Sequence, residues 1–212
     1  MNMAVLPPTR HSSQTDFRQL RHQTRNALAG ILGQLTTGLS GHDPSRRVAA
    51  ELERRVLLTV RIADCLFGLT EAPGRFEDRL SNLCASVLDL AGQPDQYLTL
   101  SCQADGEVPL QHQETVLRVA HELVGNAVKH GMHMRLLGRI DVRVAAGRTS
   151  TELDVTDDGW GCGSGPVCGE GTRIARLLAV EHCGTFGLRR DGPLTRATLC
   201  LPTKGVAAYS SL

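Results

Sequence analysis

Aromatic side chains are scarce in this sequence of 212 residues, where Phe, Trp and Tyr together make up 3%. So few rings argue against a surface on which nucleic-acid bases stack. An excess of one charge is also lacking, since 23 Lys and Arg stand against 22 Asp and Glu, for a formal net charge of +1. A nearly neutral chain has no broad basic surface for a phosphate backbone. We therefore expect no nucleic-acid partner.

Long hydrophobic runs are missing as well. No apolar stretch approaches the roughly 18–20 residues that a membrane-spanning helix needs. The first residues, M-N-M-A-V-L-P-P-T-R-H, lack the apolar core of a secretion signal. We expect no membrane insertion and a cytoplasmic location.

The seven cysteines show no metal-binding spacing. Their number is odd, and no two of them form a C-x-x-C pair. Most stand among apolar residues, where cysteine behaves as a small buried hydrophobe. We therefore expect reduced thiols rather than a structural zinc site or disulfides.

Two amphipathic helices are predicted in the first third of the chain. Residues 1–12 carry no periodicity and are expected to be a disordered lead-in. The S-Q-T-D string from Ser13 is a capping box, and apolar residues then recur at three- and four-residue steps to about Leu39. Asp43 and Pro44 are typical of an N-cap and a first helical position, and they begin a second helix to about Phe67.

These helices predict a hairpin over residues 13–74 that buries only one face of each helix. Pairing with a second copy into a four-helix bundle would bury the rest, so we expect a homodimer through this segment. The second helix would contribute its apolar seam, made of Val48 or Ala49, Leu52, Val56, Val60 or Thr59, Ala63 and Phe67.

The remainder, residues 75–203, predicts an α/β sandwich, followed by a loose tail at 204–212. Helices are expected at 77–91, 111–129 and 173–182, and strands at 97–102, 139–145, 151–156, 185–190 and 195–201. This order gives a largely antiparallel sheet and not the parallel sheet of a Rossmann fold. The predicted class is thus α+β.

The stretch H-E-L-V-G-N-A-V-K-H-G at 121–131 carries a polar stripe. At helical spacing Glu122, Asn126, Lys129 and His130 share one face, which would suit metal-bound phosphates. An amphipathic helix with a solvated polar face is the alternative for this stretch alone.

Glycine-rich turns follow this helix and its hairpin. The string D-D-G-W-G contains Asp157, Gly159 and Gly161, and G-E-G-T, with Gly169 and Gly171, opens a helix. Backbone N–H groups at such a helix start can receive phosphate, although glycines in ordinary turns give the same pattern. His22, in R-H-Q-T-R-N, falls off its helix seam. It is either a surface histidine or an exposed imidazole nucleophile.

Taken in order, these four motifs resemble those of the sensor histidine kinases, whose Bergerat-type GHKL ATPase fold is shared with gyrase and MutL. The stretch 121–131 resembles the N box, 157–161 the G1 box and 169–171 the G2 box. The string around His22 resembles the H box of the H-R-x-K-N subclass and its HWE relatives. The resemblance covers about residues 14–203.

The resemblance implies ATP and Mg²⁺ as ligands. Asn126 would hold Mg²⁺, with Glu122 as a second metal or water-orienting carboxylate, and Lys129 and His130 would approach the phosphates. Asp157 would bind the adenine amino group. The four glycines named above would shape the pocket.

The resemblance also implies the reaction. His22 would be autophosphorylated and would pass the phosphoryl group to an aspartate of a response-regulator receiver domain. With no sensor segment before residue 13, we expect a separate sensor protein to supply the input.

Three departures from the family pattern concern ATP binding and autokinase rate. Gln23 and Arg25 replace the arginine and lysine of the H box, residues 162–168 form a short lid, and the G2 box reads G-E-G-T-R-I-A. They leave two alternatives open. One is a histidine phosphotransferase with a decayed nucleotide site, and the other is an anti-sigma-type GHKL serine kinase or partner-binding regulator.

Overall fold

The computed structural model describes residues 43–68, 74–160 and 170–203. The predicted helix at 13–39, the lead-in, the lid and the tail lie outside the described residues. The elements in chain order are α2 (Asp43–Phe67), α3 (Phe76–Ala91), β1 (Tyr97–Asp105), α4 (Leu110–Asn126), the π-helical turn η1 (Ala127–Gly131), β2 (Leu137–Ala146), β3 (Ser150–Asp157), α5 (Glu170–Glu181), β4 (Thr185–Asp191) and β5 (Leu194–Pro202).

The five strands form one mixed sheet in the order β1-β2-β3-β5-β4. Only β1 and β2 are parallel, and the other three pairs are antiparallel. Two of the antiparallel pairs, β2–β3 and β4–β5, are the predicted hairpins. In the turn of the first hairpin, Gly147 N–H donates to the Ser150 carbonyl at 2.8 Å. Gly192 has φ +60° in the second turn, a value that glycine adopts without strain. The prediction of a mixed, largely antiparallel sheet is confirmed.

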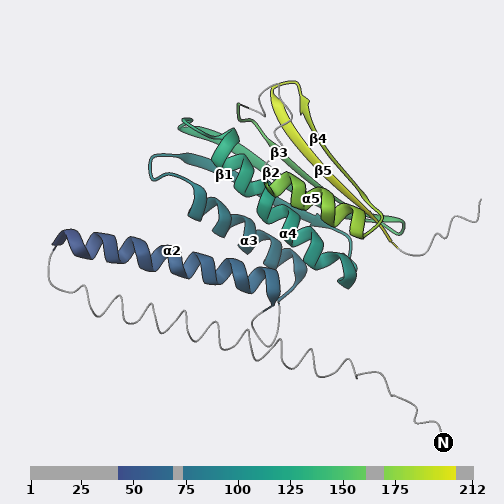
Figure 1. The fold of residues 1–212 in the computed structure, drawn as a ribbon, viewed down its shortest axis with the longest axis horizontal. Coiled ribbons are helices and arrows are strands. Elements are labelled where there is room, and N and C mark those ends of the chain that lie inside the picture. Colours follow the sequence, from purple (N-terminus) through teal and green to yellow (C-terminus); the bar gives the residue numbers. More distant parts are fainter. Residues whose placement is uncertain (1–42, 69–73, 161–169, 204–212) are drawn as a thin grey trace, which may run out of the picture.

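Helices α3, α4 and α5 cover one face of this sheet (Figure 1). On β2, Ile140, Val142 and Val144 are buried beneath them, while the alternate residues face outward. The outward face is polar, as the Arg139–Asp141 ion pair at 2.7 Å shows. One-sided burial with period two explains why these strands could be predicted from alternation.

Helix α2 packs on α3, on the side away from the sheet (Figure 1). It buries Leu58, Ile62 and Cys65, none of which belongs to the seam predicted for this helix. Leu58 lies two positions beyond Val56 and hence about 200° further around the helix. Helix α2 therefore has a second apolar face, and α3 supplies the surface that covers it.

Most of the predicted seam of α2 is not in the core. Val48 is 66% exposed, Leu52 36% and Phe67 45%. The boundary predicted near residue 75 falls between α2 and α3, and its role as a domain boundary stays a prediction.

Candidate functional site

Helix α4 does not continue as an α-helix to Lys129, as its periodicity predicts. It ends at Asn126 and widens into the π-helical turn η1, which closes when Met132 N–H donates to the Ala127 carbonyl at 2.8 Å. The wider turn shifts every residue after Asn126 away from its α-helical position, and such turns occur often at functional sites. Lys129 and His130 are exposed on this turn.

Glu122 and Asn126 both contact the first turn of α5. A Cβ atom at position 171 would lie 2.7 Å from Glu122 Oε2 and 2.8 Å from Asn126 Nδ2. A side chain at position 171 would therefore displace the ends of the Glu122 and Asn126 side chains from their present positions. The close approach places the N-terminal end of α5, which is the positive end of the helix dipole, beside the two polar side chains. A carboxylate, an amide and a helix N-terminus together suit a metal-bound phosphate.

Asp157, at the end of β3, packs against the end of η1. A Cβ atom on Gly131 would lie 2.7 Å from Asp157 Oδ1, and one on Gly159 would lie 2.3 Å from the Gly131 carbonyl oxygen. The backbone N–H of Trp160 donates to that same carbonyl oxygen at 2.9 Å. The turn after β3 and the turn after α4 are thus in backbone contact, which leaves no room for a side chain at position 159. A side chain at position 131 would displace the Asp157 carboxyl group.

The Asp157 carboxyl group is buried, at 8% exposure. Burial raises its pKa, and the N–H of Gly159, which donates to Oδ1 at 2.9 Å, acts in the opposite direction. The charges of Arg190 and Arg135 also lower this pKa, whereas Asp158 raises it. A buried carboxylate is suited to accept a hydrogen bond from a donor such as an aromatic amino group.

Two arginines that the sequence did not single out support this turn. Arg190, from β4, donates to the Gly159 carbonyl at 3.2 Å. Arg135 donates to the Asp158 carbonyl, and its guanidinium lies 5.9 Å from the centre of the Trp160 ring. Neither arginine belongs to a sequence motif. Arg190 could have been identified only from the strand order, in which β5 lies between β3 and β4 and so brings β4 near the end of β3.

The structure therefore joins two predicted groups through η1. Glu122 and Asn126 lie beside Gly171 at one side, and Asp157 and Gly159 lie against Gly131 at the other. His121 was also missed, and its Nδ1 lies 3.2 Å from Glu122 Oε1. Three predicted site residues lie outside the described residues: His22, Gly161 and Gly169.

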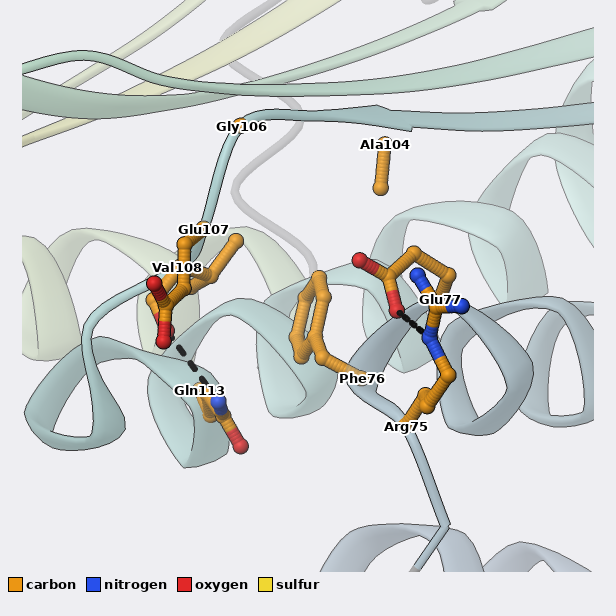
Figure 2. Close-up of a pocket in the computed structure, with 8 residues that line it drawn as sticks. All are labelled: Arg75, Phe76, Glu77, Ala104, Gly106, Glu107, Val108 and Gln113. Carbon is orange, nitrogen blue, oxygen red and sulfur yellow. Dashed lines mark hydrogen bonds and ion pairs between the residues drawn. The ribbon is translucent and has the colours of Figure 1, made fainter.

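A hollow of about 560 Å³ lies elsewhere, at the start of α3 and α4 and the end of β1 (Figure 2). Its charged side chains are partly paired, since Arg75 Nε and Glu77 Oε2 are 3.3 Å apart. Gln113 from α4 lies in its wall, and Asn126 is 13 residues further along the helix, a distance of about 20 Å. The hollow contains none of the predicted site residues, so we place the candidate site at the other end of α4.

Within the described ranges, no helix is both long and apolar enough to cross a membrane. No protein-family model matches the sequence, and no curated protein matches it either.

Solved structures do share the fold. The chain is similar to the histidine kinase domain of the blue-light activated histidine kinase EL346 of Erythrobacter litoralis, with a TM-score of 0.56 and 18% identity over 85% of this chain and 94% of that domain. A longer structure of EL346 gives a TM-score of 0.55 and 18% identity over 94% of this chain. This chain covers 62% of that longer structure. The likeness establishes the fold, an α+β sandwich that this chain shares with the EL346 histidine kinase domain.

Proposed function

We propose that this chain is a histidine kinase core that transfers a phosphoryl group from ATP to His22 and then to an aspartate of a receiver domain. One observation carries the proposal. Asn126 and Glu122 meet the N-terminal turn of α5 at Gly171, while Asp157 meets the end of the same α4–η1 segment. A polar stripe, a helix N-terminus and a buried carboxylate that are separate in sequence thus form one candidate nucleotide site.

Each described residue has a role that its surroundings support. Asn126 and Glu122 would hold Mg²⁺ through side-chain oxygens, and the exposed Lys129 and His130 would approach the phosphates. Asp157 would accept a hydrogen bond from the adenine amino group. Bound ATP with Mg²⁺ would supply the transferable phosphoryl group and the positive charge that stabilises it. Gly161 and Gly169 would complete the pocket.

His22 would be the acceptor. A neutral imidazole nitrogen is a competent nucleophile, and Arg21 and Arg25 beside it in the sequence would offset the charge of the phosphohistidine. Phosphoryl transfer depends on in-line positioning more than on acid–base groups. The H-box string makes the H-R-x-K-N or HWE-like subclass the one we propose.

We propose a homodimer through residues 13–74, operating in the cytoplasm and receiving its signal from a separate sensor protein. The exposed apolar residues Val48, Leu52 and Phe67 of α2 support this arrangement because they belong to the predicted bundle seam.

Incubation with γ-labelled ATP and Mg²⁺ tests the proposed reaction. The wild type should acquire an acid-labile, alkali-stable label, as phosphohistidine does, and His22→Ala and Asn126→Ala should both lose it. Gly187→Ala is the matched control, because nothing lies within 4 Å of a Cβ at that position of β4. It should label like the wild type.

Other outcomes would identify the rival functions. No label, together with acceptance of phosphate from a phosphorylated receiver domain, would indicate the histidine phosphotransferase. A label that survives His22→Ala would contradict both histidine-based functions and would favour a serine kinase.

A further inference from the structure

Three free thiols gather where α2, α3 and β1 meet, away from the candidate nucleotide site. Cys65 of α2 is 7% exposed and Cys84 of α3 is 0% exposed, while Cys102 of β1 is half-buried. Strand β1 is an edge strand of the sheet, paired only with β2. Cys102 is thus the member of this group that solvent reaches most easily.

Cys102 contacts one turn of α3. Ser81 and Cys84 are three residues apart and so lie on the same side of that helix. Both side chains hydrogen-bond with the Cys102 sulfur. The contact with Cys84 lowers the pKa of Cys102, partial burial acts in the opposite direction, and the contact with Ser81 lowers it again. The contact with Cys102 and burial raise the pKa of Cys84 well above its usual range. Of the two sulfurs, that of Cys102 thus loses its proton more readily.

We propose that Cys102 and Cys84 are a redox-sensitive pair that a peroxide converts to a reversible disulfide between β1 and α3. The Cys102 thiolate would attack one peroxide oxygen, the O–O bond would break, and hydroxide would leave, giving a sulfenic acid. The Cys84 thiol would then attack that sulfur, an S–S bond would form, and water would leave. Two electrons pass from the two thiols to the peroxide.

The asymmetry between the two sulfurs fits these roles. A peroxide reacts with a thiolate that it can reach, and a neighbouring thiol then resolves the sulfenic acid. Cys84 is sealed from solvent but touches Cys102, so it can resolve and cannot readily be oxidised first. The proposal does not depend on kinase activity.

Cys200 provides a matched comparison on the same sheet. It is also a half-buried strand cysteine, on β5, with its sulfur 3.9 Å from Glu152 Oε1. Burial and then the charge of Glu152 raise its pKa, and a contact with Ser150 acts in the opposite direction. It is therefore half-buried like Cys102, but its pKa is raised and not lowered.

The full chain, reduced and then treated with hydrogen peroxide, tests the pair by thiol counting and peptide mapping under non-reducing conditions. The expected result is a fall from seven free thiols to five, with a linked Cys84–Cys102 peptide that dithiothreitol separates. Cys200→Ser should form this disulfide at the wild-type rate. In Cys102→Ser, Cys84 should stay unmodified. This variant tests the pair without a substitution at the fully buried Cys84.

Three results would overturn the proposal. One is oxidation of Cys102 to sulfinic acid with no linked peptide. Another is a Cys65–Cys84 link in its place. The third is a Cys102 that reacts no faster than Cys200 in the same sample.

Discussion

At the scale of single residues, the contact between Gly159 and Gly131 leaves no room for a side chain. A Cβ at position 159 would lie 2.3–2.5 Å from three backbone atoms of Gly131, which cannot move aside as a flexible side chain could. The turn that carries Asp157 is therefore held in place by the turn that ends η1.

Gly159→Ala should separate these two turns. We expect a loss of about 1–3 kcal/mol in the free energy of unfolding, as overpacking usually costs, and weaker ATP binding. Urea unfolding and nucleotide titration would measure the two effects. Gly187→Ala, in open space, should leave both nearly unchanged. Equal behaviour of the two variants would contradict the close contact.

Asp157→Asn should stabilise the fold while weakening ATP binding. Burial raises the pKa of Asp157, so the charged form costs stability above the folded pKa, and asparagine removes that cost while keeping an oxygen for Gly159 N–H. Loss of a charge-assisted bond to the ligand should reduce affinity roughly ten- to hundredfold. Thermal unfolding at neutral pH and titration with ATP would show both effects. A less stable variant with unchanged affinity would contradict this role.

Residues of the site differ in how far the sequence predicts them. Asn126 and Asp157 stand in short strings whose spacing implies their neighbours, and Asn126 lies beside Gly171 while Asp157 lies beside Gly131. Arg190 has no such string. Its contact with Gly159 exists because β4 lies beyond β5 in the sheet, and no local pattern encodes that order.

At the scale of elements, hydrogen bonds from arginines connect α2 to the helix layer, and Arg79 makes those at the end of α2. Arg79 of α3 donates through Nε and Nη2 to the Cys65 carbonyl, at 3.2 and 2.9 Å, and so caps the last turn of α2. Its Nη1 also reaches Gln113 of α4, at 3.5 Å.

Arg79→Ala should loosen this connection. We expect a cost of about 1–3 kcal/mol, because the bonds involve a charged donor and a half-buried carbonyl. Urea unfolding would measure the cost, and hydrogen exchange should become faster in the last turn of α2. Arg143→Ala, an exposed position on β2, should change stability by less than about 0.5 kcal/mol. Unchanged exchange in α2 of the Arg79 variant would contradict the capping role.

Two histidines join α4, β3 and α5 at the end away from the candidate site. His112 Nδ1 lies 2.9 Å from Thr151 Oγ1, and His182 Nε2 lies 2.8 Å from Thr115 Oγ1. The two rings meet edge to face, 5.7 Å apart. Burial, and then the charge of His182, lower the pKa of His112 below 6.5, while the Pro202 carbonyl raises it.

Stability should therefore fall in mildly acidic solution. As the pH drops below about 6.5, the unfolded chain binds a proton at residue 112 before the folded protein does. The contribution of His112 is thus complete above that pH and is lost from there down to its lowered folded pKa. His112→Asn keeps a partner for Thr151 but does not titrate. Urea unfolding from pH 7.5 to 5 should show a smaller decrease for this variant, and an equal decrease would contradict the assignment.

Helices and strands with one buried face were predictable from the sequence. A change of helix type and a second buried face within one helix were not. The hairpins follow from period-two alternation, and α3 and α5 follow from helical spacing with glycine nearby. The π-helical turn has no such signal, because the apolar spacing of 110–131 is that of an ordinary α-helix. The Leu58–Ile62 face of α2 was missed because only packing on α3 distinguishes it from the seam.

At the scale of the whole molecule, the order of the motifs carried more information than any one of them. Each motif alone has an ordinary explanation, as a solvated helix face, a turn or a surface histidine. The fold places the described ones at one end of α4, as a single nucleotide site would require. The EL346 kinase domain has this fold at only 18% identity, so the two chains share the fold although most of their side chains differ.

Titration of the full chain with ATP, with and without Mg²⁺, tests the central claim most directly. We predict saturable binding of one ATP per chain that is strengthened by Mg²⁺. Asn126→Ala should lose most of the strengthening, Asp157→Asn should weaken binding in both conditions, and Gly187→Ala should bind as the wild type does. Binding that is unchanged in both site variants, or absent from the wild type, would contradict a nucleotide site between α4, β3 and α5.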